Sequence, residues 1–140
     1  MAYWLLKTER SVYSYSDLVR DKKTMWDGVT NNLALKHIRS MKKGDLAFIY
    51  HSGDEKAVVG IAEVASNPYP DPKQKDPKLA VVDLKPIELL AKAVTLSEIK
   101  SDKTFRPFAL VRIPRLSVMP VSKEIWKGIM DRTKQGFREK

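Results

Sequence analysis

The sequence contains no cysteine, which excludes disulfide bonds and metal sites built on thiolates. Its two histidines, His37 and His51, are too few to suggest a zinc site. No apolar run approaches the roughly 18 residues of a membrane span, and the chain begins with a strand pattern rather than the basic region of a signal peptide. We therefore expect a cytoplasmic protein with no metal, no cofactor and no membrane contact.

Signatures of catalysis are also missing. The sequence has no phosphate-binding glycine-rich loop, no Gly-x-Ser-x-Gly elbow and no His-Glu-x-x-His motif. His51 and Ser52 could act as a base and a nucleophile, but neighbours on a strand point to opposite faces, and no orienting acid is evident. The sequence therefore predicts a protein that is not an enzyme.

Positive charge, in contrast, is present in excess. The 140 residues include 26 Lys and Arg against 17 Asp and Glu, which gives a formal net charge of +9. Such an excess attracts polyanions and speeds their encounter with the protein, and nucleic acid is the obvious candidate. The alternative is a basic protein without such a partner, because part of the excess lies near the C-terminal end. The length fits one compact domain, which we expect to be a monomer.

The strand patterns predict an α+β domain on a small, strongly bent sheet. Residues 45–64 form a hairpin in which Gly60 indicates a bulge or the close approach of another backbone. Strict alternation of strands and helices is absent, so a doubly wound sheet is not expected. The predicted strands cover residues 3–8, 45–51, 56–64, 80–84 and 108–113, with residues 115–119 beside the last of them.

Capping signals and apolar stripes predict the helices. Ser14 and Asp17 form a capping box, and Thr95 and Glu98 form another. The final helix follows Ser122, so we predict a folded domain over residues 1–132 and a flexible basic tail over residues 133–140. The proline-rich segment over residues 67–77 is either a lip over a site or a variable connection. The helices are expected over residues 15–22, 34–43, 95–100 and 122–132.

The stretch from Met25 to Asn32 places an aromatic ring, a carboxylate and two amides around a glycine turn. An indole such as that of Trp26 stacks on a nucleobase with about 1–3 kcal/mol, and a carboxylate such as that of Asp27 accepts from an exocyclic amine. If these side chains converge, they form a slot for a single unpaired base. The alternative is structural, with Trp26 as a core anchor, Asp27 as a turn acid and Asn31 or Asn32 as a helix cap.

Several motifs in order resemble a known family. They are Trp4 to Glu9, Trp26 to Val29 with Asn31, Met41 to Asp45 leading into Phe48 to Ser52, Gly60 to Val64, Tyr69 to Asp71, and Arg115 to Val118 with Pro120 and Val121. Together they resemble the EVE domain, a family of small bacterial proteins and of thymocyte nuclear protein. That family lies within the PUA-like superfamily, which also holds the YTH and ASCH domains.

The resemblance implies a PUA-like bent mixed β-barrel of about five or six strands with flanking helices, and a pocket that reads one modified base. By position, the pocket residues would be Lys7, Thr8, Glu9, Trp26, Asp27, Val29, Asn31, His51 and Ser52. Candidates for phosphate contacts are Arg10, Arg112 and Arg115. Arg10 stands where the family usually has proline, which either loosens the strand exit or adds a phosphate contact.

We therefore predict a non-catalytic domain that binds nucleic acid through a modified base. A modified cytosine in DNA, such as 5-methylcytosine, is favoured because Asp27 would face its amino group. One alternative is an RNA-binding module that acts on tRNA or rRNA, and another is a sensor or hydrolase of small molecules or modified nucleotides. Replacing Trp26 with alanine is expected to abolish binding and to leave the fold largely intact.

Overall fold

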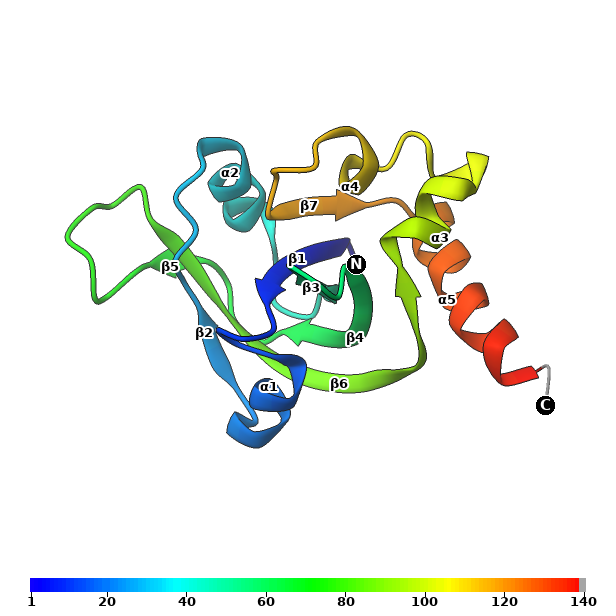
Figure 1. Ribbon diagram of the computed structural model, residues 1–140. Helices are drawn as coiled ribbons and strands as arrows, with labels where there is room; N and C mark the ends of the chain where they lie inside the picture. Colours follow the sequence, from blue (N-terminus) through cyan, green and yellow to red (C-terminus); the bar gives the residue numbers. More distant parts are fainter. Residues whose placement is uncertain (139–140) are drawn as a thin grey trace.

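A single curled sheet organises the structure (Figure 1). The computed structural model describes residues 1–138, and the side chains of residues 1–134. The strand order is β2-β6-β4-β3-β1-β7, and β5 pairs with β6 outside this path. The predicted α+β class and the bent mixed sheet are therefore confirmed. The strands are β1 (Tyr3–Glu9), β2 (Thr24–Trp26), β3 (Leu46–Ser52), β4 (Ala57–Val64), β5 (Tyr69–Pro70), β6 (Ala80–Thr95) and β7 (Val118–Val121).

Strand β1 lies between β3, which runs parallel to it, and β7, which runs antiparallel. Leu5 and Leu6 are fully buried in this strand, as its continuous apolar run predicts. The parallel register places Lys7 beside Tyr50, and each following residue of β1 beside the next residue of β3. The polar end of β1 and the polar end of β3 therefore come together at one edge of the sheet.

The β3–β4 hairpin contains the irregularity predicted around Gly60. Ile49 pairs with Gly60 and Tyr50 pairs with Val58, so that Val59 has no partner in the ladder. A Cβ atom on Gly60 would lie 2.4 Å from Cε1 of Tyr15. The bulge and the close approach are therefore both present, but the close neighbour is an aromatic ring rather than a backbone.

Strand β6 is much longer than the predicted strand over residues 80–84. It continues through Pro86 to Thr95 and pairs with β2 and then with β4. Pro86 lies next to a register shift of the β4–β6 ladder, where the missing N–H interrupts no regular pairing. The proline therefore falls at a bend of the strand and does not end it.

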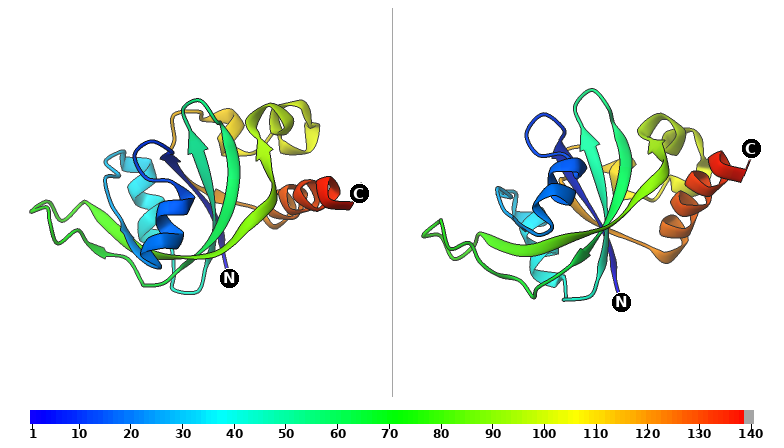
Figure 2. Two further views of the ribbon diagram at one scale, coloured as in Figure 1. Left: turned by 60° about the horizontal axis from the view of Figure 1, so that its bottom comes forward. Right: turned by 90° about the horizontal axis from the view of Figure 1, so that it is seen from below.

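The helices surround this sheet. Figure 2 shows α1 and α2 on one side of the β3–β4 hairpin, and α3 and α5 on the other. Both predicted capping boxes are confirmed, because Ser14 and Thr95 each exchange side-chain hydrogen bonds with the acid three residues later. The helices are α1 (Tyr15–Asp21), α2 (Asn32–Ser40), α3 (Leu96–Ser101), α4 (Ala109–Arg112) and α5 (Lys123–Arg138), and a 3-10 turn covers Lys103–Phe105.

Other predicted segments also differ in the structure: β7 begins at Val118 and pairs with β1, and α2 ends at Ser40. Residues 108–113 form the short helix α4 and not a strand, because Pro107 and Pro114 flank the segment and its N–H groups bond locally, as from Val111 to Phe108 O. Helix α5 continues past residue 132, where we predicted that it ends. Thr133 is 3% exposed, and its hydroxyl accepts a hydrogen bond from the backbone N–H of Lys92 at 2.8 Å. The predicted tail therefore does not begin at residue 133, and its last two residues lie outside the described residues.

A buried carboxylate ties the beginning of the chain to the sheet. Asp45, which is 5% exposed, accepts hydrogen bonds from the indole of Trp4 at 3.0 Å and from the backbone N–H groups of Ala2 and Lys42 at 3.1 and 2.9 Å. Burial opposes ionisation of this carboxyl, but the three donors outweigh burial and lower its pKa.

Among the described residues, none of the helices has the length and apolar content needed to cross a membrane.

Candidate functional site

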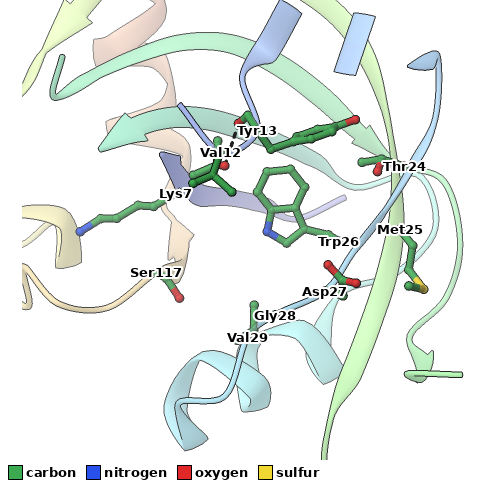
Figure 3. Close-up of a pocket in the computed structure, with 11 residues that line it drawn as sticks. Lys7, Val12, Tyr13, Thr24, Met25, Trp26, Asp27, Gly28, Val29 and Ser117 are labelled. Atoms are coloured by element: carbon green, nitrogen blue, oxygen red, sulfur yellow. Dashed lines mark hydrogen bonds between the residues drawn. The ribbon is translucent and has the colours of Figure 1, made fainter. Parts of the chain in front are cut away.

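A cavity of about 430 Å³ lies where the end of β1, the loop after it, β2 and the segment leading to α2 meet (Figure 3). We call it the Trp26 cavity. Figure 3 shows the indole of Trp26 at its centre, with Tyr13 on one side of the ring and Asp27 on the other. The residues that line it are Lys7, Thr8, Val12, Tyr13, Thr24, Met25, Trp26, Asp27, Gly28, Val29 and Ser117.

Trp26 is both a core residue and a wall of this cavity. It ends β2, opposite Val82 of β6, and its side chain is only 8% exposed. Tyr13 packs against the indole edge-to-face, with ring centroids 6.2 Å apart and an interplanar angle of 84°. Gly28 follows with φ of +80°, a conformation that glycine adopts at little cost, and turns the chain around the cavity. The indole is therefore held firmly at the cavity wall.

Tyr13 is a cavity residue that the sequence analysis did not identify as part of the site. Its carbonyl accepts a hydrogen bond from the hydroxyl of Thr8 at 2.7 Å, and its own hydroxyl donates to Asp21 at 2.8 Å. Burial raises the pKa of the Tyr13 hydroxyl, which keeps this ring neutral. Thr8 therefore shapes the cavity by fixing the loop that carries Tyr13, and its hydroxyl hydrogen is already used.

Lys7 is the basic residue among those that line the cavity, and Figure 3 shows its side chain extending away from Trp26. Its ammonium group donates to the carbonyl of Pro114 at 2.7 Å and lies 5.7 Å from the centroid of the Tyr50 ring. Burial lowers the pKa of Lys7 from its ordinary value. The contact with Pro114 also brings the segment between α4 and β7, which carries Arg115 and Ser117, to the rim of the cavity.

Asp27 provides an accessible acceptor. Its side chain is 41% exposed, and one carboxylate oxygen lies 3.7 Å from the ammonium group of Lys73. An exposed ion pair of this kind contributes less than about 1 kcal/mol, so the carboxylate remains available to a ligand. Lys73 belongs to the proline-rich loop after β5, so this ion pair brings the loop beside Asp27, but the residues that line the cavity include none from the loop.

Asn31 and His51 lie outside the cavity lining and have structural partners. Asn31 is the N-cap of α2, and its side-chain oxygen accepts from the N–H of Ala34 at 3.0 Å. His51 is 6% exposed, and its Nε2 accepts from the N–H of Tyr15 at 3.0 Å. We therefore assign the ring proton to Nδ1, which lies 2.8 Å from Glu55. Both side chains position elements around the cavity and do not line it.

The other residues predicted to contact a base or a phosphate lie outside the Trp26 cavity. Glu9, Arg10 and Ser52 line a separate depression, which they share with Ser11, Asp54 and Glu55. Arg10 lies 4.0 Å from Glu55, in a largely exposed ion pair. Arg112 and Arg115 are exposed, and neither lies within 4.0 Å of a carboxylate among the residues whose side chains are described. The predicted residues that share the Trp26 cavity are Lys7, Thr8, Trp26, Asp27 and Val29.

The family model of the EVE domain matches residues 2–132. The chain belongs to the EVE domain family. This EVE domain is similar to Rpa0253 from Rhodopseudomonas palustris, with 39% identity and a TM-score of 0.91 over 96% of this chain and 94% of that one. It is also similar to human THYN1, solved in complex with DNA that contains 5-methylcytosine, with 27% identity and a TM-score of 0.87 over 96% of this chain and 98% of that one.

A more distant likeness is to the fold of a YTH domain. The YTH domain of the Zygosaccharomyces rouxii MRB1 protein, solved with N6-methyladenosine RNA, has 14% identity and a TM-score of 0.59 over 94% of this chain and 86% of that one. This likeness shows a shared fold. The family and the PUA-like fold that the sequence motifs predict are both confirmed.

Proposed function

We propose that this EVE domain binds a nucleic-acid strand by holding one modified base in the Trp26 cavity. The observation that carries the proposal is that an indole face and an accessible carboxylate, from Trp26 and Asp27, line the same open cavity. The indole supplies stacking of about 1–3 kcal/mol with any base. The carboxylate supplies the preference, since it accepts from an amino group on the edge of the base.

A modified cytosine in DNA is the ligand that these groups favour. The exocyclic amine of cytosine is a donor that matches Asp27. Val12 and Val29 provide apolar surface in the same cavity, against which a methyl group could pack. The crystal structure of the related human protein with 5-methylcytosine DNA supports the same choice of ligand.

The cavity implies that the base is unstacked before it binds. A volume of about 430 Å³ accommodates a base but not a duplex. Extruding a base costs a few kcal/mol, and less when the strand is already single. The net charge of +9 lowers the cost of bringing the phosphate backbone to the protein. Single-stranded DNA should therefore bind at least as well as the duplex of the same sequence.

We also propose that the domain has no catalytic role. The Thr8 hydroxyl donates to a carbonyl, and both ring nitrogens of His51 are engaged by Tyr15 and Glu55. Neither Thr8 nor His51 is therefore free to act as a nucleophile or as a base beside the Trp26 cavity. Incubation with modified and unmodified nucleotides should leave them unchanged, and turnover of either would contradict this proposal.

The decisive experiment is a binding titration with matched oligonucleotides. Fluorescence anisotropy would compare single strands that carry 5-methylcytosine, 5-hydroxymethylcytosine or cytosine at one position, in DNA and in RNA of the same sequence. We expect tighter binding of a modified DNA strand. Equal affinities for modified and unmodified strands would contradict the proposal. A preference for the RNA strand would instead favour an RNA-binding module, because the 2′-hydroxyl is what distinguishes the two polymers.

A further inference from the structure

A second cavity, of about 270 Å³, adjoins the Trp26 cavity and shares Lys7 with it. We call it the lysine cavity, because three lysines from separate elements line it. Lys7 comes from β1, Lys56 from the turn before β4, and Lys100 from α3. The other residues that line it are Tyr50, Ser52, Gly53, Leu96, Leu110 and Pro114.

The three ammonium groups have no carboxylate partner within 4.0 Å among the side chains that the structure describes. The recorded hydrogen bond of the Lys7 ammonium goes to a neutral carbonyl, that of Pro114. Like charges around one small hollow repel one another, and a bound anion would turn this repulsion into attraction.

Backbone interactions fix the positions of Lys56 and Lys100 relative to each other. Lys56 has φ of +47°, a left-handed conformation that is uncommon for residues other than glycine. Its carbonyl accepts a hydrogen bond from the N–H of Leu96 at 2.8 Å, which ties the hairpin turn to the first residue of α3. Lys100 follows one turn later on that helix. This hydrogen bond therefore holds the backbone of Lys56 next to the helix that carries Lys100.

Tyr50 adds a neutral donor to the same cavity. It is 3% exposed, and its hydroxyl has no hydrogen-bond partner among the described residues. Burial raises the pKa of this hydroxyl, so it keeps its proton. No side-chain oxygen or nitrogen of the described residues is both buried and without a partner, so this hydroxyl oxygen is open to solvent in the cavity and can donate to a ligand oxygen.

We propose that the lysine cavity binds a phosphate group, which is the backbone phosphate next to the base held in the Trp26 cavity. The assignment to a backbone phosphate rests on the proposed function, and the affinity for phosphate rests on the lysine cavity alone. Because Lys7 borders both cavities, a base and its neighbouring phosphate can occupy them together. The pair of cavities thus sets the direction in which the strand crosses the protein.

The test uses Lys56→Gln and Lys100→Gln, because Lys7 belongs to both cavities. Lys127→Gln is the matched control, since Lys127 is exposed on α5 and lines neither cavity. Affinity for modified and unmodified single strands is measured at several salt concentrations. Each lysine cavity variant should make the negative slope of log affinity against log salt shallower, by up to about 0.7, the value for one complete phosphate contact on a single strand. The ratio of the two affinities should not change.

A second measurement changes the charge of the ligand, so that loss of binding by the wild-type protein cannot come from misfolding. Uncharged methylphosphonate linkages are placed on either side of the modified base, one at a time. At one of the two positions wild-type binding should weaken, and the effect of Lys56→Gln should disappear. A modified nucleoside monophosphate that binds more tightly than its nucleoside, in a manner that depends on Lys56 and Lys100, would support the phosphate site and assign it to free nucleotides.

The two proposals fail in different ways. If the lysine cavity variants behave as Lys127→Gln does, or if neither methylphosphonate weakens binding, the phosphate site is wrong even when the modified base is still preferred. If wild-type protein shows no preference for the modified base but the salt slopes still depend on Lys56 and Lys100, the base proposal is wrong and the phosphate site stands.

Discussion

Replacing Trp26 with leucine separates its role in the core from its role at the cavity wall. The indole is 8% exposed, so removal of the whole side chain, as in Trp26→Ala, should cost about 3–5 kcal/mol of folding stability. The expectation from sequence that this alanine variant leaves the fold intact is therefore revised. Leucine keeps much of the apolar volume and removes the flat face. We expect Trp26→Leu to cost less stability than alanine and to lose the stacking energy.

The expected loss of affinity follows from the free energy of stacking between the indole and the base. A loss of about 1–3 kcal/mol corresponds to an affinity for the modified strand that is about 5- to 150-fold weaker. Fluorescence anisotropy would measure this affinity, and circular dichroism would show that the variant is folded at the temperature used.

Trp126→Leu is the matched control, because Trp126 stacks on Phe48 at a centroid distance of 3.8 Å and lines neither cavity. This control should lose stability and keep its affinity. If folded Trp26→Leu binds the modified strand as tightly as wild-type protein, Trp26 is a core residue only, and the reasoning is wrong.

Three further predictions concern single side chains. Asp27→Asn should reduce the preference for the modified cytosine strand about 10-fold, because a carboxylate that faces an amine is replaced by an amide; Asp54→Asn serves as an exposed control, and unchanged preference in the anisotropy titration would remove Asp27 from the site. Asp45→Asn should destabilise the fold by about 2 kcal/mol near neutral pH in urea unfolding, since hydrogen bonds to a charged acceptor are lost. Because the pKa of Asp45 is lowered in the folded protein, its contribution to folding stability is present above the pKa of the unfolded chain and is lost as the pH falls through the folded pKa. The difference in unfolding free energy between variant and wild type should therefore shrink below about pH 4. A difference that stays constant with pH would argue against an ionised Asp45. Gly60→Ala should cost about 1–3 kcal/mol in the same assay, because the new Cβ would lie 2.4 Å from the Tyr15 ring, and the cost should vanish when Tyr15 is also alanine; a cost that persists in the double variant would show that the ring is not its cause.

Local signals in the sequence predicted much of the fold. These signals are the capping boxes at Ser14 and Thr95 and the buried apolar runs of β1, β3 and β4. Each of them depends only on residues that are neighbours in the sequence. Strand β2 was missed because its three residues are too few to show a period. The course of β6 through Pro86 depends on the partner strand, and nothing in the residues around that proline reveals it.

The candidate site was predictable in part for the same reason. Trp26, Asp27 and Val29 stand close together in the chain, so their convergence needed only a turn at Gly28. His51 was assigned to the pocket from the family resemblance, but the N–H of Tyr15 that engages it comes from a distant part of the sequence. Ser117 enters the cavity from the segment before β7 in the same long-range way; it lies within the Arg115 to Val118 motif, but nothing local in that motif indicates the cavity.

The contact between Thr133 and Lys92 bears on how the domain is best produced. The family match ends at residue 132, one residue before the hydroxyl that accepts the Lys92 N–H. A recombinant fragment trimmed to the matched range would leave that amide free on β6, and unpaired strand amides invite intermolecular sheet formation. Expression designs that retain the whole of α5 should therefore give material that aggregates less during purification and crystallisation.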